Sequence, residues 1–519
     1  MMKKWMVVLL AGVLIGYSAV AQKIQIDNVR KSAQRASGAI KDGAEIKGYY
    51  FFYVNDKVDK KTNEYSLQIL DNNLKVLKDI KFTESNKVTI LESSFNGTDL
   101  IFLFYNTEDR TLDYRVYGAD GNKKSFGYSR ELTKKENAYL QTTYFAVNDE
   151  DDTYTGLYPV ENVGFISNMP SREGNDFTFQ VDYFSTEKRK QWTYVPPGDD
   201  SKRCIGDYLG YCNGVVYFEV LKLKGMLDQK PDSYIVGLSL ETGKQLFEKQ
   251  TDGKFRFYPS SLTILNNGKP YLFGEYFEPG GNVMKDKSQG FAFWGLDESG
   301  KVTSEKYCSW ANDISKYAEV TANGKIDEFG YFYLHKMLQA SDGNIYAVGE
   351  GFKKVASALG IAGKVLSGGQ GGGLSAVKAR VTDMAIMKFD PQFNVTGLTF
   401  YKKNANNIEL RSGMEFISIP LMGKMLKYNY GGFDYSYTQY DKDVNTFSVC
   451  YSDFVRSKEY KGATFNSITF NEGKFTTDRI STTSNATRTW VLPGKTGQVL
   501  VLDYYKKDKK LEGHFEKLN

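Results

Sequence analysis

Apolar and polar residues alternate along most of the chain with a period of two, which is the pattern of half-buried β-strands. In seven segments such a run is followed by a turn that contains Asp, Asn, Glu or Gly, and then by a second run. This order predicts a β-hairpin, because those residues allow the chain to reverse tightly. The seven hairpin segments begin at Ser66, Tyr114, Phe179, Tyr234, Phe291, Met384 and Asn466.

A second type of hairpin precedes most of these segments. Its second strand is a dense run of apolar and aromatic residues, as expected of a strand that is covered on both faces. Two hairpins together make a four-stranded antiparallel sheet, and repeated units of about 50 residues are typical of a β-propeller. Hairpins of the second type begin at Ile90, Tyr208, Thr263, Lys336 and Arg488.

We therefore predict an all-β protein in which residues 22–519 form a single β-propeller domain of seven or eight four-stranded antiparallel blades. The abundance of aromatic residues, with 37 Tyr and 34 Phe, agrees with extensive β-structure. A pair of β-sandwiches and an irregular multidomain all-β protein are the alternatives. No segment alternates strands with helices, so the pattern argues against a parallel α/β sheet.

The two ends of the predicted propeller are expected to share one blade. The last hairpin, from Arg488, is followed only by Leu511–Leu518, which supplies a third strand. Lys23–Val29 alternates properly and has no other partner. We predict that this N-terminal strand pairs with Leu511–Leu518 and completes the last blade. Counting the composite sheet gives eight blades, and seven is the alternative, because the second type of hairpin is less regular.

Two stretches interrupt the repeat, at about residues 352–382 and 431–462, and are predicted to be insertions. The first contains the run GKVLSGGQGGGLSAVKARV, from Gly363 to Val381. Apolar residues on both sides of the glycines recur at spacings of three and four, which predicts two short amphipathic helices around a Gly-rich hinge. This insertion is interpreted as a cover for a blade edge, or as a lid or partner-docking segment. The apolar positions are Val355, Leu359, Ala362 and Leu366 before the hinge, and Leu374, Val377 and Val381 after it.

The glycine run does not have the context of a phosphate-binding loop. Gly371, Gly373 and Ala376 match G-x-G-x-x-A, but residues 367–370 are not a strand. The Lys364 position also fails the P-loop pattern, because Val365 follows where Ser or Thr is required. The sequence therefore predicts no nucleotide cofactor.

The first residues predict export. Lys3 and Lys4 precede an apolar run that ends with Ala19 and Ala21, which is the pattern of a signal peptide cleaved before Gln22. A membrane anchor is the alternative reading of residues 1–21, and no later stretch is as apolar as a spanning helix. We expect a periplasmic, cell-surface or extracellular protein. The net charge of +5 is small for 519 residues and gives no reason to expect nucleic acid as a partner.

Histidine and cysteine offer little for catalysis. The two histidines, His335 and His514, fall in predicted strands, and no His/Cys cluster has the spacing of zinc ligands. A Ser-His-Asp site would have to use one of these two, and a structural role is favoured for both. Cys204 and Cys212 are close enough in sequence to form a disulfide, with buried thiols as the favoured alternative.

Acidic loops are the best candidates for metal binding. Asp149 and Asp151 lie in NDEDDT, and Asp441 and Asp443 lie in DKDVN. Calcium takes six to eight oxygen ligands, which such loops could begin to supply. Both loops lack the glycine at position six and a well-placed glutamate at position twelve. Solvated turns are therefore favoured, and no metal is predicted.

The run Lys378–Lys403, together with the Gly-rich insertion before it, resembles an uncharacterised family of secreted, propeller-like proteins from Bacteroidetes-type bacteria. The resemblance implies a cell-envelope setting and supplies no catalytic residues. We expect a non-catalytic binding or scaffold protein for a glycan, peptide or protein partner. The alternative is a propeller glycoside hydrolase or related glycan-processing enzyme, which would need two opposed carboxylates, and the sequence singles out no such pair.

Overall fold

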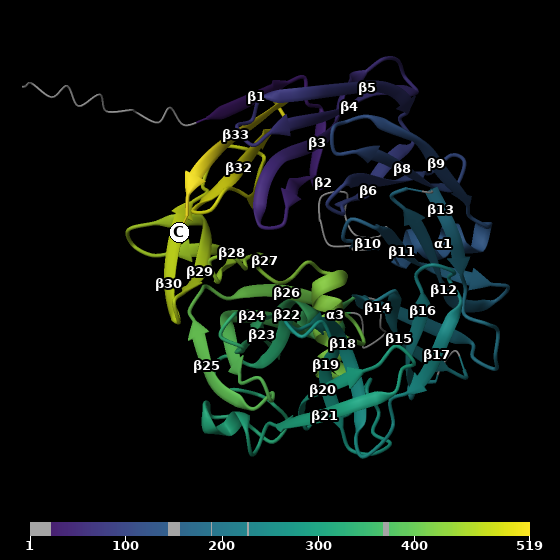
Figure 1. Cartoon of the computed structure of the whole chain (residues 1–519). Coiled ribbons are helices and arrows are strands. Elements are labelled where there is room, and N and C mark those ends of the chain that lie inside the picture. Colours follow the sequence, from purple (N-terminus) through teal and green to yellow (C-terminus); the bar gives the residue numbers. More distant parts are fainter. Residues whose placement is uncertain (1–21, 144–155, 188, 226–227, 367–372, 519) are drawn as a thin grey trace, which may run out of the picture.

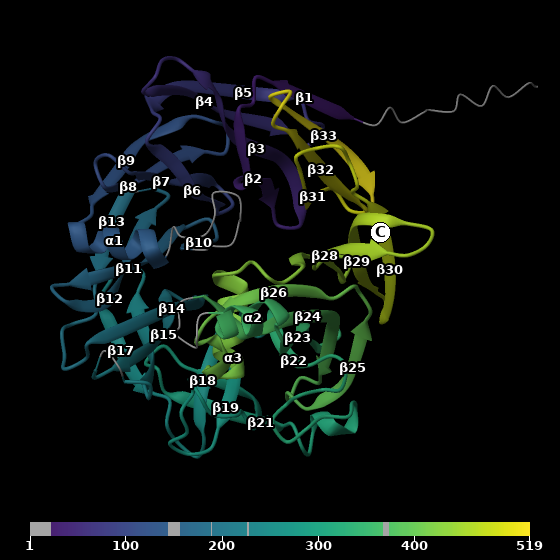
Figure 2. The same ribbon diagram turned by 180° about the vertical axis from the view of Figure 1, so that it is seen from behind.

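The computed structural model describes residues 22–143, 156–187, 189–225, 228–366 and 373–518. Figures 1 and 2 show its antiparallel sheets arranged in a ring, so the chain is a β-propeller, as predicted. The signal peptide predicted for residues 1–21 lies outside the described residues. Within the described residues, no helix is both long enough and apolar enough to span a lipid bilayer.

Four of the sheets are simple four-stranded antiparallel meanders. The first contains β2 (Lys31–Asp42), β3 (Glu45–Lys57), β4 (Thr62–Asp71) and β5 (Val76–Ser85). The second contains β6 (Val88–Phe95), β7 (Asp99–Asn106), β8 (Thr111–Gly118) and β9 (Lys123–Glu131). The third contains β18 (Arg256–Ile264), β19 (Pro270–Phe277), β20 (Gly290–Leu296) and β21 (Val302–Ser309). The fourth contains β27 (Tyr435–Asp441), β28 (Thr446–Arg456), β29 (Lys461–Asn471) and β30 (Lys474–Ser481).

Two successive meanders join into one eight-stranded sheet. They are linked by a single parallel bridge between Phe177 and Arg203. The first meander contains β10 (Leu157–Val160), β11 (Gly164–Glu173), β12 (Asp176–Ser185) and β13 (Arg189–Tyr194). The second contains β14 (Arg203–Cys212), β15 (Val215–Leu223), β16 (Asp232–Ser239) and β17 (Gln245–Gln250).

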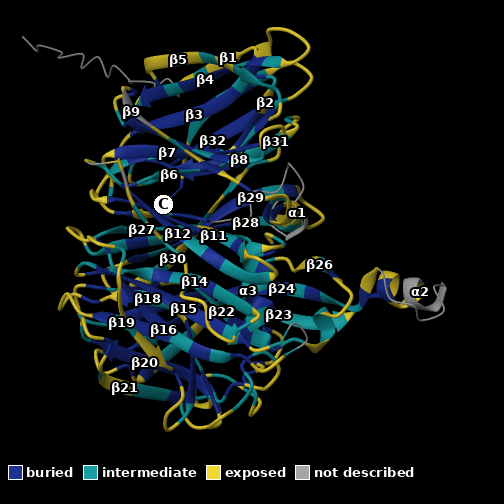
Figure 3. Ribbon diagram, turned by 90° about the vertical axis from the view of Figure 1, so that its right-hand side faces the viewer, coloured by how far each residue is buried: buried dark blue, intermediate teal, exposed yellow. Residues whose placement is uncertain are grey.

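The next sheet carries a projection. It contains β22 (Tyr331–Gln339), β23 (Ile345–Ala356), β24 (Leu374–Phe389) and β25 (Val395–Tyr401), and β26 (Asn406–Arg411) pairs with the outer part of β24. β23 and β24 continue past the sheet as a ribbon, with β26 as a third strand along β24, and the last pair of β23 with β24 is Ala356 and Val377. The helix α2 (Ala358–Leu366) follows the ribbon and stands away from the body of the protein (Figure 3).

The ring closes as the sequence predicted. β31 (Arg488–Pro493), β32 (Gln498–Tyr505) and β33 (Lys510–Lys517) are completed by β1 (Lys23–Asp27) from the start of the described chain. β1 pairs antiparallel with β33 from Lys23–His514 to Asp27–Lys510. Val29 N then donates to Lys509 O at 2.7 Å, which extends the pairing beyond the strand.

The predicted turns have a physical basis that repeats between sheets. Asp71 Oδ1 accepts hydrogen bonds from the backbone N–H groups two and four residues later, and so do Asp297 and Asp390. The residue three positions after the Asp has a positive φ, of 65° at Leu74 and 60° at Phe393. Both side chains are buried, so packing offsets the cost of the left-handed backbone.

The core lies mainly between neighbouring sheets and is rich in aromatic rings. Between the first two meanders, Phe52 packs against Tyr65, Phe102 and Phe104 with ring centroids 5.4–5.8 Å apart. Burying side chains of this size removes a large apolar area from water and is the main source of stability. Each sheet therefore depends on its neighbours for a covered face.

Two expectations about the insertions differ from the structure. Residues 431–462 hold β27, β28 and the start of β29, so they are part of a sheet and not an insertion. After the glycine run, the segment predicted to be a helix is strand β24, because it pairs with β23 on one side and β26 on the other. The helix predicted before the glycines is present as α2.

The remaining helices lie outside the strand repeat. They are α1 (Lys134–Thr143), α3 (Ile419–Tyr428) and the short 3-10 helices η1 (Ile314–Lys316) and η2 (Met414–Phe416). Figures 1 and 2 both place α3 and β26 inside the outline of the ring. The true interruption between the last two full meanders is therefore residues 406–434, which carry β26, η2 and α3.

Candidate functional site

The helix α3 is held firmly at its start. Ser418 occupies the cap position, and its hydroxyl accepts from Leu421 N at 3.4 Å and donates to Val283 O at 2.6 Å. Pro420 follows in the first turn, where its missing N–H is not needed. Met422 and Leu426 bury the apolar face of α3 against the ribbon of β23 and β24, including Phe352. The opposite face of the helix is left for polar contacts.

A pocket of about 460 Å³ lies between α3, α1 and the strands β11, β12 and β14. Aromatic side chains supply much of its wall, and most of these side chains are only partly buried. Polar side chains converge on it from both the strands and the helix. The aromatic residues are Tyr139, Tyr158, Phe177, Phe179, Tyr208, Tyr333 and Tyr428, and the main polar residues are Asn168, Arg203, Asp207, Lys424 and Asn429.

Lys424 is the central charge of the pocket. Its Nζ lies 2.9 Å from Asp207 Oδ2 and 3.6 Å from Glu219 Oε2, and 4.4 Å from the centre of the Tyr258 ring. Burial disfavours a charged Lys424, but the nearby Asp207, Tyr258 and Glu219 outweigh it and hold the lysine pKa well above its usual value. The lysine therefore remains an ammonium group at neutral pH.

Glu219 lies behind Lys424 and has no exposed side-chain surface. Burial raises the pKa of Glu219 to about 8, and the charge of Lys424 opposes that rise. Glu219 is absent from the pocket wall, whereas Asp207 belongs to it. Asp207 is the one acidic side chain in the described lining, and it is already paired with Lys424.

The aromatic wall is ordered by ring contacts. The Tyr158 and Tyr208 rings stack with centroids 4.1 Å apart, and Tyr139 meets Phe177 edge-on at 4.7 Å. Asn168 Nδ2 donates to Gly206 O at 2.7 Å, while its buried Oδ1 has no hydrogen-bond partner among the described residues. The pocket thus offers several ring faces and an uncommitted amide oxygen.

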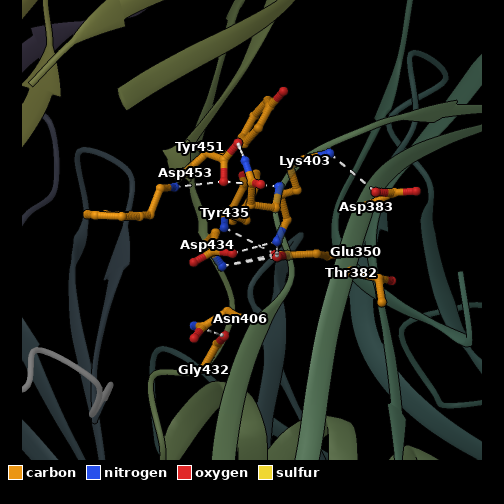
Figure 4. A network of polar contacts seen from close by, with 12 residues as sticks. Glu350, Thr382, Asp383, Lys403, Asn406, Gly432, Asp434, Tyr435, Tyr451 and Asp453 are labelled. Atoms are coloured by element: carbon orange, nitrogen blue, oxygen red, sulfur yellow. Dashed lines mark hydrogen bonds and ion pairs between the residues drawn. The ribbon is translucent and has the colours of Figure 1, made fainter. Parts of the chain in front are cut away.

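A second polar cluster lies at the join between the sheet of β22–β25 and the sheet of β27–β30 (Figure 4). Glu350 Oε1 lies 3.0 Å from Lys403 Nζ, and Lys403 is also bonded to Asp434. The backbone N–H groups of Asp434 and Tyr435 donate to Glu350 at 3.1 Å. Burial raises the pKa of both carboxyl groups, and the Lys403 charge opposes this. Two carboxyl groups therefore compete for one ammonium group.

His335 belongs to this second cluster. Its Nε2 lies 3.2 Å from Glu350 Oε2, and its ring stacks on Tyr435 with centroids 4.5 Å apart. Burial, and then the charges of Lys427 and Lys403, hold the His335 pKa well below its usual value. His335 is therefore neutral. Lys427, on α3, lies 5.3 Å from the centre of the Tyr435 ring, so α3 faces one cluster with Lys424 and the other with Lys427.

The residues singled out from the sequence lie elsewhere. His514 is in β33, in a different sheet from His335, with its Nε2 3.3 Å from Glu516. Asp441 Oδ1 accepts from the N–H groups of Asp443 and Val444 in the turn after β27, away from the pocket. Asp149 and Asp151 lie outside the described residues. All four cysteines are free thiols, so Cys204 and Cys212 form no disulfide.

Sequence reasoning missed the pocket because α3 was not recognised. The signal was present: Ser418 and Pro420 mark a helix start, and Met422 and Leu426 are spaced four apart. The pairing of Lys424 with Asp207 had no sequence signal. The two residues are far apart in the chain, and only the closed ring of sheets brings α3 next to β14.

Comparison with known proteins identifies the family. The model of a family of unknown function, DUF6770, matches residues 1–519. The chain belongs to the DUF6770 family. This agrees with the resemblance to an uncharacterised family, while the bacterial origin suggested by the sequence stays a prediction. A search of curated proteins found no match for this DUF6770 chain.

The solved structures named here are only distantly similar to this DUF6770 protein. The quinohemoprotein alcohol dehydrogenase ADHIIG from Pseudomonas putida HK5 is 10% identical, with a TM-score of 0.44 over 96% of this chain and 75% of that chain. The WD40 domain of SCAP from fission yeast is 6% identical, with a TM-score of 0.37 over 95% and 94%. The β-propeller domain of the Trilobed protease from Pyrococcus furiosus is 10% identical, with a TM-score of 0.30 over 72% and 96%. No TM-score here reaches 0.5, so the assignment of the fold rests on the sheets described above.

Proposed function

We propose that this DUF6770 protein is an exported, non-catalytic binding protein, and that the pocket beside α3 holds part of a glycan that carries an acidic group. The observation that carries the proposal is the composition of the pocket wall. Seven aromatic residues and the cations Arg203 and Lys424 line it, together with a single carboxylate. Enclosed sites with apolar walls and a few converging polar groups are the usual form of ligand sites.

The ring faces support a ligand that contains flat or ring-shaped units. Tyr139, Tyr158 and Tyr208 are each partly exposed, and each also has a hydroxyl group at the end of its ring. Such side chains combine an apolar face with a polar edge, which suits the alternating C–H and O–H surfaces of a sugar. The amide oxygen of Asn168 adds an acceptor for a ligand hydroxyl.

Arg203 supports the proposal that the ligand carries an acidic group. It lines the pocket at the start of β14, and no acidic side chain among the described residues lies within ion-pair distance of it. Arginine binds carboxylates with two parallel hydrogen bonds, which gives orientation as well as affinity. Lys424 is less available to a ligand, because it already forms an ion pair with Asp207. Arg203 is therefore the cation that a carboxylate on the ligand would meet.

A glycoside hydrolase is less well supported by the same site. Such enzymes place two carboxyl groups on either side of the bond that they cleave. Asp207 is the one described carboxyl group in the lining, and its neighbour Glu219 is fully buried and shares Lys424 with it. The site therefore supports binding without cleavage. Export rests on the residue pattern before Gln22 alone.

A screen of neutral and uronic acid-containing oligosaccharides against residues 22–519 tests the proposal, followed by calorimetry of the hits. We expect acidic glycans to bind, and Arg203→Gln to remove the preference for them. Tyr208→Ala should weaken all hits. Arg479→Gln, on β30 and outside the pocket, is the matched control. Equal binding by Arg203→Gln and the wild type would contradict the assignment, and newly formed reducing ends would favour the hydrolase.

A further inference from the structure

The tip of the projection exposes large apolar side chains to solvent. Figure 3 shows α2 at the end of the β23–β24 ribbon, well outside the ring of sheets. Exposed apolar groups that cluster at one place on a soluble protein mark a site of interaction. The exposed fractions are 65% for Leu359, 46% for Ile361, 41% for Leu374 and 74% for Phe416.

These side chains come from three segments that meet at one point. Gly360 lies so close to Ser375 that an added Cβ would be 1.6 Å from Ser375 O. Ser375 is buried, and its hydroxyl donates to Glu415 Oε2 at 2.7 Å. Leu374 precedes Ser375, and Phe416 follows Glu415. The contacts of Ser375 thus gather the exposed apolar residues into one tip.

The positions of the exposed side chains on α2 favour contact with a lipid bilayer over binding in a groove of a partner protein. Successive residues of a helix point about 100° apart. Gly360 faces the ribbon, so Leu359 and Ile361 project to either side of the helix, and both are exposed. A groove on a partner protein covers one side of a helix, whereas the outer layer of a bilayer can surround the helix on both sides.

Charge beneath the tip complements an anionic surface. The ribbon, β26 and the residues just after β26 carry five basic side chains among the described residues. The same segments carry two acidic side chains. Of the acidic residues, Glu415 accepts from Ser375, and Glu409 accepts from Ser357 and lies 3.9 Å from Lys378 Nζ. Lys354 donates to the backbone oxygens of Glu415 and Ile417, and it forms no ion pair with a described carboxylate. Anionic lipid headgroups attract basic residues of this kind within about a Debye length. The basic residues are Lys353, Lys354, Lys378, Arg380 and Arg411.

We propose that this tip docks on the surface of an anionic lipid bilayer. Leu359, Ile361 and Phe416 enter the headgroup layer, and the basic side chains behind them contact phosphates. The pocket beside α3 takes no part, so the inference is independent of the proposed glycan binding.

Sedimentation with lipid vesicles tests the proposal. Residues 22–519 would be mixed with vesicles of phosphatidylethanolamine and phosphatidylglycerol, and separately with vesicles of phosphatidylcholine. We expect binding to the first, weakened by added salt, and little binding to the second. Leu359→Gln with Ile361→Gln should weaken binding about ten-fold or more. Leu246→Gln changes a leucine on β17 that is 50% exposed; it is the control and should bind normally.

Phe416→Ser gives a second, separate test, because it changes η2 and leaves α2 intact. Circular dichroism and the melting temperature establish that each variant is folded. Vesicle binding that persists in both the double variant and Phe416→Ser would overturn the proposal. So would equal binding to phosphatidylcholine, or a wild-type protein that binds no vesicles but captures an envelope protein through the tip.

Discussion

Lys403 Nζ lies 3.0 Å from Glu350 Oε1, and neither side chain is exposed to solvent. The lysine follows β25 and the glutamate is in β23, while their common neighbour Asp434 leads into β27 of the next sheet. This ion pair is therefore the centre of a polar contact that fastens two sheets of the ring together. Removing one member of a buried pair leaves the other charge without compensation.

Replacing Lys403 by Met should destabilise the protein by about 3–5 kcal/mol, because Glu350 and Asp434 would lose their shared cation. Urea unfolding followed by fluorescence measures the change. Adding Glu350→Gln to the same variant should recover part of the loss. Lys402→Met is the matched control: its Nζ lies 3.0 Å from Asp383, but its side chain is 72% exposed, so its unfolding midpoint should move far less than that of Lys403→Met. An equal effect of the two single variants would refute this role for the buried pair.

Glu92 should make stability depend on pH. It is buried, and its Oε2 accepts from the N–H groups of Gly156 and Leu157 at 2.8 and 3.2 Å. Burial raises its pKa to about 8, against the effect of these backbone hydrogen bonds. Between its pKa values in the unfolded and folded states, the folded protein holds a proton that the unfolded chain has released. The contribution of Glu92 is therefore full at low pH and falls as pH rises towards 8.

The measurement compares the wild type with Glu92→Gln, which keeps an acceptor oxygen but cannot titrate. Wild-type stability should fall relative to the variant by about 1.4 kcal/mol per pH unit between pH 5 and pH 7. Glu84→Gln, at a part-exposed position on β5, is the control and should follow the wild type. Parallel stability curves for the wild type and Glu92→Gln would show that Glu92 is ionised in the fold.

Closure of the ring can be tested at a single side chain. Ile26 is buried opposite Leu511, whereas the adjacent Gln25 is exposed opposite Glu512. Ile26→Ala should lower stability by about 2–4 kcal/mol, and Gln25→Ala should be nearly neutral. Deletion of residues 22–29 should cost several kcal/mol and shift the whole unfolding transition, since it removes a strand. An unchanged melting temperature in the deletion variant would mean that closure is not needed.

The projection should be removable beyond its last strand pair. Replacing residues 357–376 by Asn-Gly joins Ala356 to Val377 in a short hairpin, and loop closure changes free energy only weakly with length. We expect a folded variant with a melting temperature close to that of the wild type. Phe352→Ala, by contrast, should cost about 3 kcal/mol, because Phe352 packs under α3. Unfolding of the shortened variant would place α2 within the core.

Local patterns predicted much of the fold. The alternation of apolar residues and the Asp-centred turns, such as that of Asp390 and Phe393, identified hairpins that are present in the structure. The pairing of β1 with β33 followed from two strands without other partners. The helix predicted around Leu374 was wrong because pairing with β23 and β26 overrides a spacing of three and four in so short a run.

The candidate site could not be predicted in the same way. Asp207, Lys424 and Tyr139 belong to distant parts of the sequence, and only the ring and α3 bring them to one pocket. Burial of Glu219 and Glu350 also depends on what packs over them, so their charge states have no counterpart in the local sequence.

The sheet shared by β1 and β33 also orders events during synthesis. Residues 23–27 leave the ribosome long before their hydrogen-bond partners at residues 510–514 are made. Until then β1 has no partner strand, and the apolar face on which Ile26 will pack against Leu511 stays exposed to solvent. Contacts between such distant residues form slowly, because a long loop must close before they are gained. The emerging chain is therefore an open arc of sheets with an exposed apolar edge, and it becomes a ring only once β33 has been made and can pair with β1.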